Sequence, residues 1–258
     1  MPHPSSIGEI FRTVSGQFLD SADPARAFEV LDQLCTLISQ DPSAIVDVKE
    51  GLNIPALQTR TAEIDGGEEA ASARAILSRS PSRDSEDAGY AWSLPDYYQS
   101  EWNFIRDHMP GPVKKMAIIG QGAIPSLAMA IRKADPSIAF DFFDIDPDAA
   151  QLSQAIMRKT FPDSGMHAND RYITADVTDF TPDNDYDLVV ITNAPVPALH
   201  NRDIPLAAPR LFIRSATQAG ETLYPRLDTD CPALQDYDVI ARGDDPVYNI
   251  HEMVMLGR

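Results

Sequence analysis

Apolar residues in the first 110 positions recur with the spacing of amphipathic helices. Ile7, Ile10, Phe11 and Val14 form one such series, and Phe28, Leu31, Leu34, Leu37 and Ile38 form another. Residues three and four apart share one face of a helix, so both series predict helices with a buried face. Asp20 and Asp23 are the candidate N-caps of the second helix, since a carboxylate there accepts hydrogen bonds from free backbone N–H groups.

A polar stretch from Gln58 to Asp87 follows these helices. Its centre, Ala70–Leu77, is a candidate helix, whereas the serine-rich segment Ser78–Gly89 has the composition of a loop. Six aromatic residues come next, namely Tyr90, Trp92, Tyr97, Tyr98, Trp102 and Phe104. We expect this aromatic segment to connect the helical half of the chain to the remainder.

Beyond Lys114 the pattern changes to short apolar runs that alternate with amphipathic segments. Strands are predicted at Met116–Ile119, Ala139–Phe143, Arg171–Thr174, Asp187–Thr192 and Arg210–Arg214, with Tyr237–Ala241 and His251–Leu256 as a closing antiparallel pair. Helices are predicted at Pro125–Ala134 and Asp148–Thr160. This alternation indicates an α/β fold with a mostly parallel, doubly wound sheet. We therefore expect a helical cap or substrate domain over residues 1–110 and a Rossmann-like domain over residues 111–258.

The charge of the chain narrows the classes of partner. Its 258 residues carry a formal net charge of −18, with a sequence pI near 4.5. Such a surface repels phosphate backbones and anionic lipids, so nucleic acids and membranes are poor partners. A small molecule is the expected substrate, and the sequence leaves the oligomeric state open.

Cysteine and histidine usage argues against a metal site or a disulfide framework. Cys35 and Cys231 lie far apart, and the five histidines show no metal-ligand spacing. The N-terminal residues lack a signal-peptide pattern, and no apolar run approaches the roughly 20 residues that span a bilayer. These features predict a cytoplasmic protein without a metal cofactor.

Two motifs predict a nucleoside site at the carboxyl edge of the sheet. Gly120-Gln121-Gly122 separates the first strand from its helix, where glycines allow close approach of a ligand to the backbone. Asp144 and Asp146 follow the second strand, where Rossmann-like folds hold ribose hydroxyls. Both NAD and S-adenosylmethionine fit that spacing, but Pro125 replaces the third glycine of the dinucleotide pattern.

Two further polar residues lie beyond other strands of this sheet. Asp176 follows the third strand and suits an adenine amino group. Asn193 follows the fourth strand and suits the amino or carboxyl group of a donor. The alternatives are a solvated carboxylate for each acid and a loop-capping amide for Asn193.

The second half of the chain resembles nicotianamine synthases. Gly120–Leu127 resembles the glycine-rich loop of that family, and Asp144–Pro147 matches its strand-end motif; Arg214–Ala216, Leu223–Pro225 and Pro246–Asn249 resemble later segments, and Leu94–Tyr97 partly matches a Phe-Pro-Tyr-Tyr motif. The motifs keep the family's order across roughly residues 90–258. The family includes plant and archaeal nicotianamine synthases and bacterial synthases of opine-type metal chelators. These enzymes transfer the 3-amino-3-carboxypropyl arm of S-adenosylmethionine to an amine and release 5′-methylthioadenosine.

The resemblance implies a Rossmann-like, class I methyltransferase-type sheet with an N-terminal helical domain. It places Tyr97 at the reacting centre, with the neighbouring Tyr98 as its rival. Asn193 is a further candidate there because of its position after the fourth strand. The expected residues for binding S-adenosylmethionine are Gly120, Gln121, Gly122, Asp144, Asp146, Asp176, Asn193, Arg214 and Tyr224. Arg214 would clamp a carboxylate or form a structural ion pair. Tyr224 would line the site or pack beside Pro225. Tyr97 and Tyr98 would act on the substrate or pack between the helical half and the Rossmann-like half.

One family feature has no clear counterpart here. Nicotianamine synthases carry a glutamate in the helical domain that is proposed to serve the incoming amine. Glu63 and the pair Glu68-Glu69 are the candidates, but their spacing differs and Gly66-Gly67 is expected to interrupt the helix. An alternative reaction therefore stays open, in which the α-amine of the donor attacks its own Cγ. This attack closes a four-membered ring and gives azetidine-2-carboxylate. A small-molecule methyltransferase, a non-catalytic nucleoside-binding protein and an NAD-dependent enzyme are the remaining alternatives.

Overall fold

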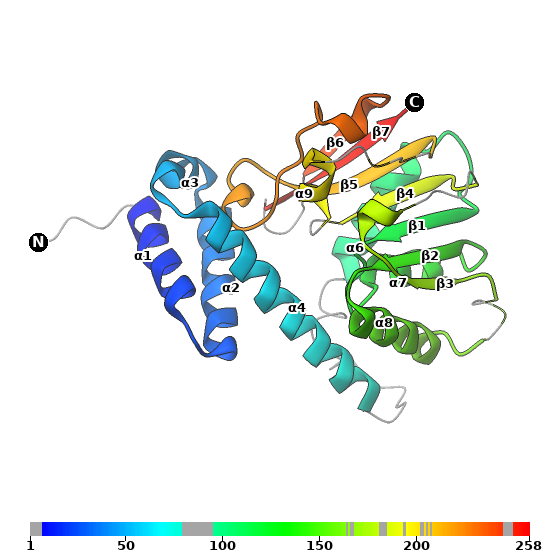
Figure 1. The fold of residues 1–258 in the computed structure, drawn as a ribbon, viewed down its shortest axis with the longest axis horizontal. Helices are drawn as coiled ribbons and strands as arrows, with labels where there is room; N and C mark the ends of the chain where they lie inside the picture. The colour runs from blue at the N-terminus through cyan, green and yellow to red at the C-terminus, as the bar shows by residue number, and fades with distance from the viewer. Residues whose placement is uncertain are drawn as a thin grey trace, which may run out of the picture.

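The structure is a computed structural model, and it describes residues 7–78, 95–163, 165, 168–180, 185–192, 195–201, 204, 206, 208–244 and 250–258. A group of helices forms one end of the molecule and a sheet covered by helices forms the other (Figure 1). A single long helix runs from the helical group to the side of the sheet (Figure 1).

The N-terminal helices are α1 (Ile7–Asp20), α2 (Pro24–Gln40), α3 (Pro42–Val48) and α4 (Ile54–Ser78). Their shared core contains Phe11, Phe18, Leu34, Ile38, Ile45 and Leu57, all fully buried. This packing confirms the two predicted amphipathic helices. The Asp23 carboxylate accepts a hydrogen bond from the Ala25 backbone N–H, so Asp23, and not Asp20, is the N-cap of α2.

Helix α4 corrects the prediction of a break at Gly66-Gly67. The helix runs without interruption from Ile54 to Ser78, which confirms Ala70–Leu77 and makes the preceding part of the polar stretch helical as well. Each glycine costs about 1 kcal/mol relative to alanine in a helix interior. Burial of one face of α4, through Leu57, Thr61, Ile64 and Ala73, offsets this penalty. Residues 79–94, with Tyr90 and Trp92, lie outside the described residues.

The sheet has seven strands in the order β3-β2-β1-β4-β5-β7-β6. Their bounds are β1 (Lys115–Ile119), β2 (Ala139–Asp144), β3 (Arg171–Thr174), β4 (Leu188–Ile191), β5 (Arg210–Ala216), β6 (Asp238–Asp244) and β7 (His251–Gly257). The first five positions pair in parallel, and β7 runs antiparallel to both of its neighbours. This order confirms the predicted Rossmann-like, class I methyltransferase-type sheet.

Helices cover both faces of the sheet, as a buried parallel sheet requires. They are α6 (Pro95–Asp107), α7 (Ser126–Ala134), α8 (Pro147–Thr160) and α9 (Val196–Asn201). Met116 and Ile118 of β1 enter the core that α6, α7 and α8 share, while Ala117 and Ile119 enter the core on the face of α9. Trp102 and Ile105 of α6 belong to the core of the sheet, so the described part of the aromatic segment is a packed helix rather than a connector. The division of the chain at residue 110 stays a prediction.

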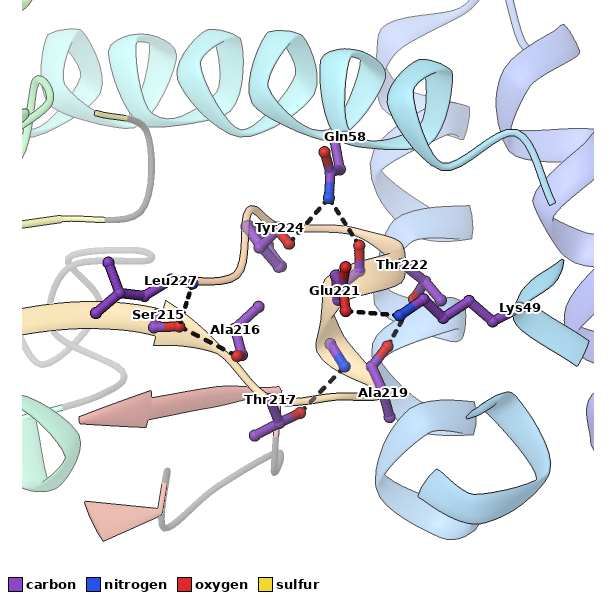
Figure 2. A network of polar contacts seen from close by, with 11 residues as sticks. Lys49, Gln58, Ser215, Ala216, Thr217, Ala219, Glu221, Thr222, Tyr224 and Leu227 are labelled. Atoms are coloured by element: carbon purple, nitrogen blue, oxygen red, sulfur yellow. Dashed lines mark hydrogen bonds and ion pairs between the residues drawn. The ribbon is translucent and has the colours of Figure 1, made fainter. Parts of the chain in front are cut away.

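Polar contacts attach the helical group to the loop after β5, which contains the 3-10 turn Gly220–Thr222 (Figure 2). The Gln58 amide nitrogen donates to the backbone oxygens of Glu221, at 2.8 Å, and Tyr224, at 3.2 Å. Lys49 forms an ion pair with Glu221 at 2.6 Å. Leu223 is buried in the core of the N-terminal helices. These contacts hold α4 opposite the carboxyl edge of the sheet.

Candidate active site

The loop after β1 is built on two glycines with left-handed backbones. Gly120 has φ of 76° and Gly122 has φ of 71°, a region that favours glycine. A Cβ at Gly120 would come within 2.6 Å of Thr192 Oγ1 and 2.7 Å of Pro195. Thr192 also donates its hydroxyl to the Gly120 backbone oxygen at 2.6 Å. The loop therefore turns tightly at the end of β1 and leaves its backbone close to any ligand beside it.

Asp144, the last residue of β2, connects the glycine loop to the residues that follow β2. One carboxylate oxygen accepts from Gly122 N at 2.9 Å and the other accepts from Asp146 N at 3.0 Å. Each oxygen keeps a second acceptor site, because an ionised carboxylate has about four. Burial raises the pKa of Asp144 above its usual value. Asp146 itself caps α8, accepting from Asp148 N at 2.9 Å.

Glu69 of α4 reaches across to the same glycine loop. Its carboxylate accepts a hydrogen bond from Ile124 N at 2.8 Å. A Cβ placed on Gly122 would lie 2.4 Å from Glu69 Oε2, so the carboxylate packs directly against the loop. Burial raises the pKa of Glu69 to about 7, and the negative charge of Asp144 adds to this effect. Glu69 therefore exchanges a proton readily near neutral pH.

A second carboxylate lies one turn earlier on α4. Tyr224 donates its hydroxyl to Asp65 Oδ2 at 2.8 Å, and burial raises the pKa of Asp65 to about 6. The Tyr224 ring meets the His251 ring edge to face, with centroids 4.6 Å apart. Burial lowers the pKa of His251 to about 3, so its imidazole is neutral at physiological pH. Tyr224 thus bridges α4 and the sheet rather than packing only beside Pro225.

Arg214 forms the structural ion pair, one of the two alternatives that the sequence left open. Its guanidinium donates to both carboxylate oxygens of Glu101, with Nε–Oε1 at 2.7 Å, and the Glu101 side chain is fully buried. The guanidinium also lies 5.7 Å from the Tyr97 ring centre and 5.5 Å from the Tyr98 ring centre. Tyr97 and Tyr98 contact each other edge to face at 4.9 Å. A bidentate pair of this kind fixes the position of both rings.

The glycine loop, Asp65, Glu69, Tyr97, Tyr98, Asp144, Arg214, Tyr224 and His251 line one cavity of about 1050 Å³ between α2, α4, α6 and the carboxyl edge of the sheet. The predicted residues that line it are Tyr97, Tyr98, Gly120, Gln121, Gly122, Asp144, Asp146, Asp176, Arg214 and Tyr224. Asn193 lies outside the described residues. The structure therefore brings every described candidate to one place, although their roles in binding stay predictions.

Details of the lining differ from one candidate to the next. The Gln121 side chain is buried and donates to Ser153 Oγ at 2.8 Å, which anchors the loop to α8. The Asp176 carboxylate accepts from Thr178 N at 2.8 Å. Ile145 is 68% exposed although it is apolar, and it too lines the cavity. In the sequence, Ile145 stands between two acids at the end of a strand. That position could have marked it as a site residue, but Ile145 is not among the residues predicted from the sequence.

Within the described part of the chain, no three side chains of histidine, cysteine, aspartate or glutamate are grouped as a metal would require. None of its helices combines the length and apolar character needed to cross a lipid bilayer.

Gly122→Ala should destabilise the protein, because the backbone is left-handed and the added methyl group must displace the Glu69 carboxylate from the loop. The conformation alone costs roughly 1–2 kcal/mol. Gly67→Ala is the matched control, since its Cβ meets no described atom within 4 Å and alanine favours a helix by about 1 kcal/mol. Thermal unfolding should show a lower Tm for Gly122→Ala and an equal or higher Tm for Gly67→Ala. Equal Tm values for Gly122→Ala and the parent protein would contradict the contact with Glu69.

The fold of the whole chain is similar to that of a nicotianamine synthase. A crystal structure of MtNAS in complex with MTA and tNA has a TM-score of 0.74 at 12% identity, with 99% of each chain covered. A glutamate-to-glutamine mutant of MtNAS in complex with S-adenosylmethionine has a TM-score of 0.73 at 13% identity, again with 99% of each chain covered. No protein-family model and no curated protein matches the sequence. The chain therefore shares the fold of these synthase structures over its full length, including the N-terminal helices, where the sequence motifs show little resemblance.

Proposed function

We propose that the chain is a transferase that binds S-adenosylmethionine in this cavity and moves its 3-amino-3-carboxypropyl arm to an amine. The proposal depends on the position of Glu69, a half-buried carboxylate with a pKa of about 7 that lines the cavity and packs against the glycine loop. The shared fold with MtNAS structures that hold S-adenosylmethionine or MTA supports the same reading.

The nucleoside of the donor fits the carboxyl edge of the sheet. The remaining acceptor sites of Asp144 suit the two ribose hydroxyls. Asp176 suits the adenine amino group, and the exposed Ile145 side chain offers an apolar surface to the adenine ring. An adenine ring bound against Ile145 would bury this exposed apolar side chain, and that burial favours binding. Asn193 remains a proposed contact for the amino acid end of the donor.

The chemistry then needs a base and a fixed geometry. The acceptor nitrogen attacks Cγ of the donor arm, the carbon–sulfur bond breaks, and its electron pair stays on sulfur as 5′-methylthioadenosine leaves. Glu69 takes the proton that the acceptor amine loses. Tyr97 and Tyr98, held by Arg214, would face the sulfonium and limit access of water. The helices before residue 110 would act as the cap that supplies the acceptor side.

The size of the cavity favours transfer to a second substrate over cyclisation of the donor. Its volume of about 1050 Å³ lies at the upper end of the roughly 300–1,000 Å³ that holds one drug-sized ligand. Chromatography of reactions with S-adenosylmethionine and a panel of amines tests the proposal. We expect 5′-methylthioadenosine whose release depends on the amine. Release that is equally fast without any amine, together with azetidine-2-carboxylate, would replace transfer by cyclisation.

The pH dependence of the reaction should follow the ionisation of Glu69. The carboxylate is the active base and the free amine is the nucleophile, so kcat/KM for the amine should rise steeply with pH below about 7 and less steeply above it. An aliphatic ammonium loses its proton near pH 10, so the fraction of free amine keeps rising through this range, and the change of slope near pH 7 reports Glu69. Initial rates between pH 5 and pH 9 measure this. A profile whose slope is the same on both sides of pH 7 would remove Glu69 from the role of base.

A further inference from the structure

The cavity continues past Glu69 into a region that the donor sites leave open. There it is bounded by α2 and α4, and its described lining residues are Phe28, Leu31, Asp32, Cys35, Pro55, Gln58, Thr59, Ala62 and Asp65. Phe28 and Leu31 of α2 make part of this lining apolar, and Gln58, Thr59 and Asp65 of α4 make part of it polar. A flexible, partly apolar molecule with polar ends matches this surface.

The charge along the cavity is strongly one-sided. Its described acids are Asp32, Asp65, Glu69, Asp144, Asp146 and Asp176. Among the described lining residues, the basic side chains are Arg214 and His251. The Arg214 guanidinium is bound to Glu101, and His251 is neutral at physiological pH. A carboxylate on the acceptor would find no described cationic side chain besides Arg214, which is already paired, whereas additional ammonium groups would meet complementary charge.

The spacing of Asp65 and Glu69 matches two nitrogens of one linear amine. They are four residues apart on α4, so they lie on one face of the helix, and their Cα atoms are about 6 Å apart along its axis. With bonds of about 1.5 Å, a chain of roughly four carbon atoms spans this distance. Two half-buried carboxylates so close repel each other, and a ligand that pairs its distal ammonium with Asp65 and passes a proton from its proximal nitrogen to Glu69 relieves that repulsion.

We propose that the acceptor is an aliphatic diamine or polyamine, with Asp65 holding its distal ammonium while its proximal amine attacks the donor beside Glu69. The inference rests on the transfer reaction proposed above and adds its substrate class. In the balanced step the proximal amine forms a bond to Cγ, the sulfur keeps the electrons of the broken bond, and Glu69 receives one proton. The distal ammonium stays protonated and takes no part in bond making.

The test compares acceptors in parallel reactions with S-adenosylmethionine, using 1,4-diaminobutane, spermidine, butylamine, glutamate and histidine. Mass spectrometry should detect the aminocarboxypropyl product and 5′-methylthioadenosine with the two polyvalent amines. Their kcat/KM should exceed that of butylamine at least tenfold. Turnover of glutamate or histidine in preference to the diamines would overturn the substrate class while leaving the transfer reaction intact. Absence of 5′-methylthioadenosine with every amine would overturn both.

Asp65→Asn separates binding of the distal ammonium from general damage to the site. Asparagine keeps an oxygen that accepts from the Tyr224 hydroxyl, so the fold should be retained. The KM for 1,4-diaminobutane should rise at least tenfold, while the KM for butylamine and for S-adenosylmethionine should change less than threefold. Glu63→Gln, an exposed residue of the same helix outside the cavity, is the matched control. An equal rise of KM for diamine and monoamine would exclude the proposed contact.

Discussion

Replacing Glu69 with glutamine is expected to lower the release of 5′-methylthioadenosine by roughly a hundredfold or more, the contribution typical of a general base. Glutamine retains an oxygen that accepts from Ile124 N, so the glycine loop should keep its position. The affinity for S-adenosylmethionine should therefore stay within threefold of the parent protein. Glu68→Gln changes the adjacent acid outside the cavity and should leave turnover unchanged.

The stability of Glu69→Gln provides a second readout that does not need turnover. Because the pKa of Glu69 is raised in the folded protein from 4.5 to about 7, its contribution to stability is complete below pH 4.5 and is lost as pH rises through 7. The glutamine variant should thus gain stability relative to the parent protein at pH 8, by about 3 kcal/mol at most, and show little difference at pH 4.5. A fully active variant, or one that is less stable at pH 8, would contradict the assigned environment of Glu69.

Asp144→Ala is expected to weaken binding of S-adenosylmethionine at least tenfold, which corresponds to about 1.4 kcal/mol. The substitution removes the acceptor for the ribose hydroxyls and also leaves the N–H groups of Gly122 and Asp146 without their carboxylate partner. The glycine loop would then lose its anchor to the end of β2. Isothermal titration calorimetry measures the affinity directly.

Asp148→Ala is the matched control for this prediction. Asp148 is an exposed acid in the first turn of α8 that does not line the cavity, so its removal should leave the affinity nearly unchanged. An Asp144→Ala protein that is folded and binds with the parent affinity would place the nucleoside elsewhere.

The sheet could be predicted from the sequence because each of its central strands is buried on both faces. Strands such as Met116–Ile119 and Leu188–Ile191 are continuous apolar runs, and turn residues or amphipathic helices bound them. The carboxyl ends of such strands meet at one edge, which is why acids as far apart in sequence as Asp144 and Asp176 could be assigned to one cavity.

The acceptor side of the site could not be predicted in the same way. The low helix propensity of glycine predicted a break at Gly66-Gly67. Burial of one face of α4 outweighs that preference, so the helix is unbroken. The unbroken helix places Glu69 beside the glycine loop. Glu69 was among the candidates, yet its contact with Ile124 joins residues 55 positions apart, one in the N-terminal helices and one in the loop after β1. The Arg214–Glu101 pair, which spans 113 positions, has no local signal at all.

The most direct test of the proposed function labels the methyl group and the aminocarboxypropyl arm, two of the three carbon groups on sulfur, in one experiment. S-adenosylmethionine with a carbon-labelled arm and a deuterated methyl group would be incubated with the enzyme and an amine acceptor, and every product would be analysed by mass spectrometry. Aminocarboxypropyl transfer predicts the carbon label in the amine product and the deuterium in 5′-methylthioadenosine. Deuterium in the acceptor, with the carbon label retained in S-adenosylhomocysteine, would contradict the account and identify a methyltransferase.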